Sequence, residues 1–185
     1  MNQIQAVIAE LQDLPRESFW PVGPETAQLL KDKVIKLNAQ NVLEIGTSRG
    51  YSGLWFCDGL MQTGGHLYTV ESHAERFSIA AENFAKAGVT NLVTQIKGHA
   101  PECIYELPAD LKFDLALIDA TKVETKDHFE SIWPRLTSKG EIIIDNVQSH
   151  QEIFQPFFEY LDQNQIPYQF LDIDFGLLHI KKGEV

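Results

Sequence analysis

The feature of this 185-residue chain that most limits its fold is a regular alternation of short apolar runs with longer amphipathic runs. The short runs have strand length, and several are almost continuously apolar, which is typical of strands covered on both faces. We expect seven strands, at Asn41–Ile45, His66–Glu71, Leu92–Lys97, Phe113–Asp119, Glu141–Asp145, Tyr168–Asp172 and Leu177–Lys182. We expect helices at Ser52–Met61, Ala74–Ala87, Pro101–Leu107, Lys126–Leu136 and His150–Asn164. This order predicts an α/β fold with a mainly parallel sheet and helices on both faces.

The chain predicts one domain over residues 1–185, because its length is typical of a single domain and no linker or repeat divides it. Residues 1–37 are expected to form a helical flank, and residues 41–185 the core. Lys139-Gly140 suggests a turn into the fifth strand. Ser149 and Glu152 have the spacing of a capping box, which predicts Ser149 as the N-cap of the last helix.

Charge and hydropathy exclude several classes of function. Asp and Glu number 26 against 15 Lys and Arg, a formal net charge of −11, and no basic stripe is visible, which argues against a nucleic-acid partner. Met1–Leu14 lacks the basic leader of a signal peptide, and no stretch approaches the roughly 18 apolar residues of a membrane span. Cys57 and Cys103 lie outside any CxxC pattern and are expected to be buried thiols. We therefore expect a cytoplasmic protein without a membrane partner.

Four of the predicted strands end in residues suited to bind a ligand. Gly46 follows the first strand, Glu71 ends the second, Asp119 ends the fourth, and Asp145-Asn146 ends the fifth. Ligands of open α/β sheets bind beyond the carboxyl ends of the strands, so these residues are expected to surround one site.

The loop after the first strand carries Gly46 and Gly50 in a GxxxG spacing. Glycines here let the backbone turn tightly and approach a ligand. Glu71, 25 residues after Gly46, is placed to accept hydrogen bonds from a ribose diol. Dinucleotide enzymes and S-adenosylmethionine enzymes both use this pattern, and Glu44 together with the missing GxGxxG favours the second class. A chance loop followed by an ordinary surface glutamate is the alternative.

The fourth and fifth strands end in oxygen ligands. Asp119, Asp145 and Asn146 would supply two carboxylates and one amide, which suit an octahedral Mg²⁺ that keeps positions for substrate oxygens. The alternative is that both aspartates are helix caps or turn residues. Two adjacent acids repel each other unless a cation or a basic group lies between them, which favours the metal site.

The segment VLEIGTSRGYSGLWF resembles the first motif of class I S-adenosylmethionine-dependent methyltransferases, most closely the catechol-O-methyltransferase-like family of bacterial metal-dependent enzymes. Upstream, FWPVGPE resembles that family's approach to the cofactor. Over residues 19–182 the resemblance implies a Rossmann-like sandwich with a seven-stranded, mostly parallel sheet and an antiparallel last strand. It implies S-adenosylmethionine contacts at Val22, Glu44, Gly46, Thr47, Gly50, Ser52, Glu71, His99, Ala100 and Asp119. His99 departs from the usual Gly-Asp-Ala turn.

The pair DATK and IIIDNV resembles the same family's metal signature. It implies that Asp119, Asp145 and Asn146 bind Mg²⁺ or another divalent ion. Lys122 would lie at the acceptor hydroxyl as the catalytic base. The segment after Lys122 has no tyrosines where relatives commonly carry them, so the acceptor wall is expected to differ. We expect His150 to be an exposed residue at a helix start.

These observations predict a divalent-metal-dependent O-methyltransferase that moves the methyl group of S-adenosylmethionine to a small catechol-like acceptor, and the resemblance implies a homodimer. One alternative keeps the chemistry but acts on a hydroxyuridine of tRNA. Two others belong to different classes, an NAD-dependent oxidoreductase and a non-catalytic cofactor-binding module.

Overall fold

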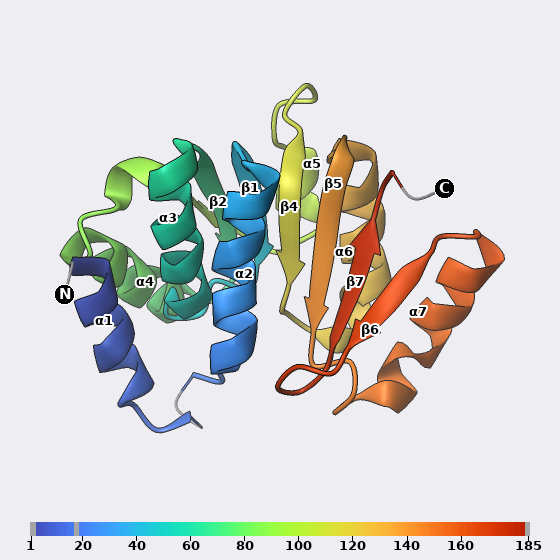
Figure 1. Cartoon of the computed structure of the whole chain (residues 1–185), viewed down its shortest axis with the longest axis horizontal. Helices are drawn as coiled ribbons and strands as arrows, with labels where there is room; N and C mark the ends of the chain where they lie inside the picture. Colours follow the sequence, from blue (N-terminus) through green and yellow to red (C-terminus); the bar gives the residue numbers. More distant parts are fainter. Residues whose placement is uncertain (1–2, 17–18, 184–185) are drawn as a thin grey trace.

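The computed structural model describes residues 3–16 and 19–183, so Met1, Asn2, Glu17, Ser18, Glu184 and Val185 of the predicted domain lie outside the described residues. Its sheet has seven strands in the order β3-β2-β1-β4-β5-β7-β6 (Figure 1). The strands are β1 (Asn41–Ile45), β2 (His66–Glu71), β3 (Val93–Lys97), β4 (Phe113–Ile118), β5 (Leu136–Asp145), β6 (Tyr168–Leu171) and β7 (Leu177–Lys181). β1 to β5 pair in parallel, whereas β7 is antiparallel to both neighbours, β5 and β6. The predicted fold class is confirmed.

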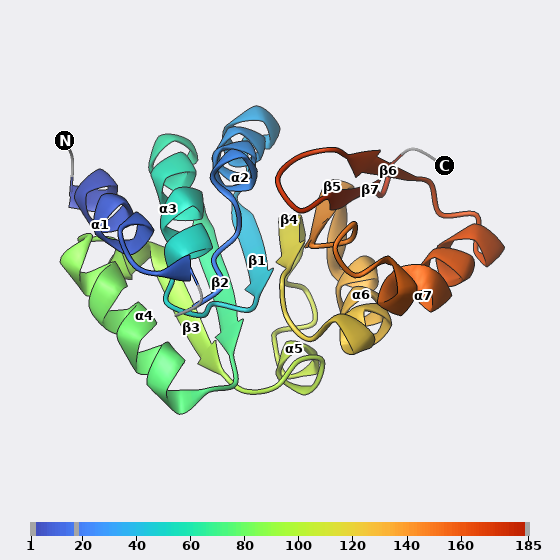
Figure 2. The same cartoon turned by 90° about the horizontal axis from the view of Figure 1, so that it is seen from below.

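Helices cover both faces of the sheet (Figure 2). They are α1 (Gln3–Gln12), α2 (Pro24–Leu37), α3 (Tyr51–Thr63), α4 (Ala74–Lys86), α5 (Glu102–Tyr105), α6 (Thr125–Ile132) and α7 (Gln151–Gln163). Successive residues of a strand point to opposite faces, and β4 shows the result. Leu115 and Leu117 pack in the core that α1, α2 and α3 cover, whereas Ala116 and Ile118 pack in the core that α6 and α7 cover. This two-sided burial explains the nearly continuous apolar run of β4.

The fifth strand and the helix before it differ from the prediction. α6 ends at Ile132, a short 3-10 turn spans Trp133–Arg135, and β5 then begins at Leu136. Lys139-Gly140 therefore lies inside the strand and not in a turn before it. Leu136 pairs with Phe113 ahead of a register shift in the ladder, and this irregular pairing extends β5 beyond the apolar run that the sequence showed.

The predicted capping box of the last helix is wrong. α7 begins at Gln151 with His150 in the N-cap position, and no side chain caps it. The Ser149 hydroxyl instead donates a hydrogen bond to the backbone oxygen of Asn146, at 3.0 Å. Asn146 has a left-handed backbone with φ 66°, which turns the loop back on itself and takes Ser149 away from the helix terminus.

Two further expectations concern the burial of the cysteines and the length of the helices. Cys57 and Cys103 are buried free thiols, as predicted. Among the described residues, every helix is too short or too polar to span a bilayer. α1 instead buries Ile4, Val7 and Ile8 in the main core.

Candidate active site

A cavity of about 500 Å³ lies at the carboxyl ends of β1, β2 and β4. Its lining brings together residues that follow several different strands, as expected for this type of sheet. The predicted site residues on the lining are Gly46, Glu71, His99, Ala100, Asp119, Lys122 and Asn146. Phe19, Trp20, His128 and His150 also line it.

Gly46 allows the ends of β1 and β4 to meet. Its φ is +105°, and a Cβ built on it would lie 2.0 Å from the backbone oxygen of Asp119. The amide of Asp119 donates to the oxygen of Ile45 at 2.9 Å, and the amide of Gly46 donates to Val70 at 3.0 Å. Only glycine fits this position, so the loop turns sharply at the cavity wall.

Glu71 ends β2 and is held by backbone amides. One carboxylate oxygen accepts a hydrogen bond from the amide of Ser48 at 2.8 Å, and the other accepts from the amide of His73 at 2.9 Å. The side chain is nearly buried, but it reaches the cavity. Each carboxylate oxygen has a further lone pair, so the group can still accept hydrogen bonds from two ligand hydroxyls.

Glu44 lies behind this loop, in a buried polar network. Its two oxygens accept hydrogen bonds from the hydroxyls of Ser52 and Thr69, each at 2.5 Å, and Thr47 contacts Thr69. Burial raises the pKa of Glu44 to about 7, although the two hydrogen bonds oppose this effect. The network supports the loop from below.

Five of the predicted cofactor contacts are therefore not brought to the cavity. Val22, Glu44, Thr47, Gly50 and Ser52 are absent from its lining. Val22 is buried in the hydrophobic core, the Ser52 hydroxyl donates to Glu44, and the Thr47 hydroxyl contacts that of Thr69. Gly50 has φ 85° and is the N-cap of α3, so its role in the structure is to turn the chain into that helix.

The turn after β3 forms the opposite wall. His99 is exposed, and its ring lies 3.4 Å from Glu102 and 3.5 Å from Glu124. His128, which the sequence analysis did not single out, is almost fully buried in α6, and its Nε2 donates to the oxygen of Ala100 at 3.2 Å. Burial lowers the pKa of His128. This contact comes from the tertiary packing of α6, and no local pattern in the sequence indicates it.

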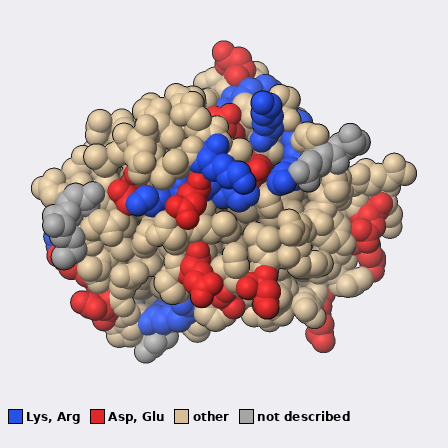
Figure 3. Space-filling view, viewed as in Figure 1, with Lys and Arg blue, Asp and Glu red and all other residues tan. Residues whose placement is uncertain are grey.

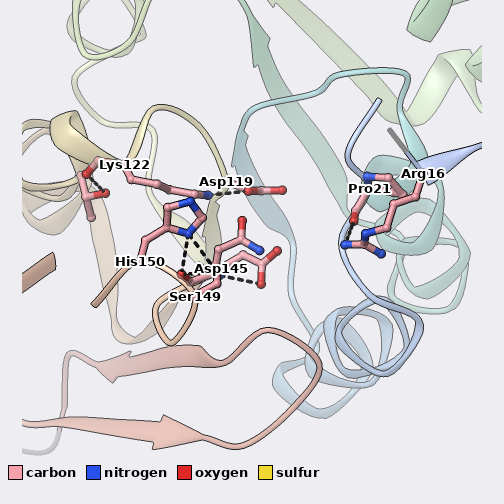
Figure 4. Close-up of polar contacts among 9 residues, drawn as sticks. Arg16, Pro21, Asp119, Lys122, Asp145, Ser149 and His150 are labelled. Carbon is pink, nitrogen blue, oxygen red and sulfur yellow. Dashed lines mark hydrogen bonds and ion pairs between the residues drawn. The ribbon is translucent and has the colours of Figure 1, made fainter. Parts of the chain in front are cut away.

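Asp119 and Asp145 lie side by side because β4 and β5 pair in parallel, with Ile118 opposite Ile144. The ammonium of Lys122 donates to Asp119 Oδ1 at 2.8 Å (Figure 4). Asp145 is buried: its Oδ1 accepts from the amide of Asn146 at 2.8 Å, and its Oδ2 has no hydrogen-bond partner. Burial, and then the negative charge of Asp119, raise the pKa of Asp145 to about 7.

These residues fit a hard divalent cation. A buried carboxylate oxygen without a partner is costly, and a cation beside it would remove that cost. Among the described residues no group of three or more His, Cys, Asp or Glu is arranged to hold a metal. The donor set here would instead be the carboxylates of Asp119 and Asp145 with the amide oxygen of Asn146, of the kind that Mg²⁺ takes together with waters or substrate oxygens.

Trp20 stands at the rim of the cavity, with 69% of its surface exposed and a left-handed backbone at φ 48°. Such a conformation is uncommon for a bulky residue and is often found at functional sites. Arg16 holds the neighbouring Pro21 in place. Its guanidinium donates to the oxygen of Pro21 at 2.8 Å (Figure 4) and lies 4.2 Å from the centre of the Phe175 ring. The cavity thus has a flat aromatic surface at its entrance.

Comparison with known proteins agrees with this geometry. Residues 43–147 match the family described as methyltransferase domain. The chain is 32% identical over 131 residues to the O-methyltransferase ankF of Aspergillus thermomutatus, covering 70% of this chain and 54% of that protein. It is 32% identical over 130 residues to a catechol O-methyltransferase of Niastella koreensis, covering 68% of this chain and 58% of that protein. The chain thus spans a little over half the length of these curated relatives.

The fold comparison extends further along the chain. The crystal structure of the Podospora anserina methyltransferase PaMTH1 with SAH bound superposes with a TM-score of 0.86 at 20% identity, covering 97% of this chain and 87% of that chain. The sheet described above is that of the class I S-adenosylmethionine-dependent methyltransferases. The protein belongs to the methyltransferase-domain family, which confirms the resemblance seen in its motifs and sets aside the NAD-dependent oxidoreductase.

Proposed function

We propose that this chain transfers the methyl group of S-adenosylmethionine to a hydroxyl of a small catechol-like acceptor, with the help of a divalent cation. The observation that carries the proposal is the meeting of two sets of residues in one cavity. Gly46, Glu71 and Ala100 line one part, while Asp119, Lys122 and Asn146 line the neighbouring part. The curated relatives named above support O-methyl transfer as the reaction.

The cofactor would occupy the part of the cavity beside β1, β2 and β3. Gly46 lets the ligand approach the backbone, and Glu71 would accept hydrogen bonds from the ribose hydroxyls while the amides of Ser48 and His73 hold its carboxylate. Ala100 and the His99 ring would border the adenine. In this arrangement the sulfonium methyl would face the ends of β4 and β5.

Asp119, Asp145 and Asn146 would hold the cation. When bound, the cation supplies a Lewis acid that orients two neighbouring acceptor oxygens and makes one hydroxyl easier to ionise. Lys122 Nζ would accept the hydroxyl proton after it has given up its own proton, when the cation replaces it as the partner of Asp119. The acceptor oxygen would then bond to the methyl carbon as the carbon–sulfur bond breaks, which would leave S-adenosylhomocysteine. Trp20 would cover one face of a planar acceptor and help to exclude water.

The charge distribution favours a small acceptor over tRNA. On the face shown in Figure 3, most Lys and Arg lie in the upper half, over α2 and the amino ends of β4 and β5, one basic patch lies near the lower edge, and Asp and Glu predominate below. The cavity lies at the other end of these strands. RNA docking depends on phosphate contacts with basic side chains, and the cavity lining offers only Arg76 and Lys122 among the described residues.

An acceptor screen with labelled S-adenosylmethionine and Mg²⁺ tests the proposal. We expect label in catechols, little in matched monophenols, and none in unmodified or hydroxyuridine-containing tRNA. If label appears only in tRNA, the acceptor is a nucleic acid and the proposed small acceptor is wrong. Tight S-adenosylhomocysteine binding without transfer to any acceptor would favour the non-catalytic cofactor-binding module.

A further inference from the structure

We propose that His150 selects the acceptor: its Nε2 accepts a hydrogen bond from a hydroxyl or N–H group that the acceptor carries next to its metal-binding diol. The inference rests on the proposed function and adds to it a third recognition point on the substrate. It follows from the position of the ring and from which of its nitrogens carries the hydrogen.

His150 is an exposed residue that lines the cavity together with Lys122 and Asn146. It precedes α7 directly, and the left-handed turn at Asn146 brings it back over the end of β5. Its Nδ1 lies 2.9 Å from the Ser149 hydroxyl and 3.3 Å from the backbone oxygen of Asn146 (Figure 4). The ring is therefore held from one side, by two contacts to its Nδ1.

These two contacts favour one tautomer of the ring. The Ser149 hydroxyl gives its hydrogen to the oxygen of Asn146, so it presents only lone pairs to the ring. The oxygen of Asn146 is a carbonyl and can only accept. All three contacts are satisfied together only when Nδ1 carries a hydrogen. In the neutral ring this leaves Nε2 as a hydrogen-bond acceptor.

Nε2 has no hydrogen-bond or ion-pair partner among the residues that the structure describes. A group of the substrate at this point would therefore have to donate. A hydroxyl or amine beside the diol would bond to Nε2, whereas a methoxy group at the same position would set oxygen lone pairs against the nitrogen lone pair. Sites built to bond a substrate hydroxyl discriminate well against analogues that lack it.

The test compares two acceptors that share the diol and differ only at the neighbouring position, 1,2,3-trihydroxybenzene and 3-methoxycatechol. In the wild-type protein with Mg²⁺ we expect kcat/KM to favour the trihydroxy compound by about tenfold, typical of one well-placed hydrogen bond. His150→Ala should bring the ratio close to one. His150→Gln, whose amide oxygen can accept, should restore part of the preference.

Ser149→Ala is the matched control, because it removes one Nδ1 contact but leaves the Asn146 carbonyl to hold the hydrogen on Nδ1. Its ratio should stay near the wild-type value. If both diols are methylated and His150→Ala leaves the ratio of their kcat/KM values unchanged, the role of His150 is overturned while the proposed function stands. No transfer to either diol by the wild type would overturn the proposed function, and this inference with it.

Discussion

The two halves of the site, each a part of the cavity lining with the buried residues behind it, differ in how completely the chain satisfies its own polar groups. On the cofactor side, Glu71 is held by two backbone amides and Glu44 by two hydroxyls. On the acceptor side, Asp145 Oδ2 is buried without a partner, and the Asp119 carboxylate is paired with Lys122. The first half is complete in the chain alone, whereas the second retains a buried carboxylate oxygen without a partner.

Because of this difference, the two halves are expected to have different requirements for ligand binding. A preorganised half can bind its ligand without rearrangement and without an added ion. A half with an unpaired buried carboxylate gains most from a cation, because the cation removes the cost of burial. Binding of the cofactor and dependence on the metal are therefore expected to be separable by mutation.

The largest effect is expected for Asp145→Ala. Loss of this ligand should lower methyl transfer by about 10³-fold or more, because the acceptor oxygens lose their anchor and their in-line geometry. Affinity for S-adenosylhomocysteine, measured by calorimetry, should stay within about twofold. The control is Asp110→Asn, which removes an exposed carboxylate in the loop before the amino end of β4 and should leave both quantities unchanged. Equal loss of both functions in Asp145→Ala would contradict the separation.

Lys122→Met is expected to lower kcat by about 10²- to 10⁴-fold through loss of the base. Affinity for Mn²⁺, measured by electron paramagnetic resonance, should rise, because Asp119 no longer has an ammonium as its partner. Lys126→Met changes an exposed lysine one turn away and serves as the control. Weaker Mn²⁺ binding in Lys122→Met would show that the lysine does not compete for the carboxylate.

Glu71→Ala acts on the other half. It should weaken cofactor binding by about 1.5–3 kcal/mol, the usual range for hydrogen bonds to a charged group, with Mn²⁺ affinity unaltered. Glu75→Ala, on the exposed first turn of α4, is the control. Calorimetry with S-adenosylhomocysteine decides the matter, and unchanged affinity in Glu71→Ala would remove this residue from the ribose role.

The smallest effect concerns stability and pH. The pKa of Glu44 in the folded chain, about 7, is above the ordinary value of 4.5, so the folded state binds its proton more tightly. Glu44 therefore contributes stability that is fully present below pH 4.5 and is lost as pH rises through 7. Urea unfolding should show a decline of order 2 kcal/mol across this window that is absent in Glu44→Gln. Equal pH slopes in the two proteins would contradict a neutral buried Glu44.

Much of the fold and part of the site could be predicted from the sequence. The strand ends carried Gly46, Glu71, Asp119 and Asp145, and parallel pairing brings these ends together whatever the loops do. Which of the motif side chains reach the cavity and which are buried behind it could not be predicted in the same way. The motif places Glu44 in a strand. Only the hydrogen bond from Thr69 in the folded chain shows that its carboxylate lies behind the cavity wall and not in the cavity.

Loop conformation was the other limit of prediction. Ser149 had the spacing of a helix cap, but its hydroxyl bonds backward because Asn146 adopts a left-handed turn. His128 likewise meets Ala100, 28 positions away, through the tertiary packing of α6. Contacts of this kind depend on the whole fold and leave no local pattern.

Chelation tests the central claim most directly. S-adenosylhomocysteine affinity and methyl transfer to a catechol would be measured on one preparation, in EDTA and then with Mg²⁺ or Ca²⁺ restored. We predict that EDTA abolishes transfer but leaves cofactor affinity unchanged. Mg²⁺ should restore transfer fully and Ca²⁺ poorly, because its longer bonds misplace the acceptor oxygen. Undiminished methyl transfer in EDTA would contradict a cation-dependent acceptor half.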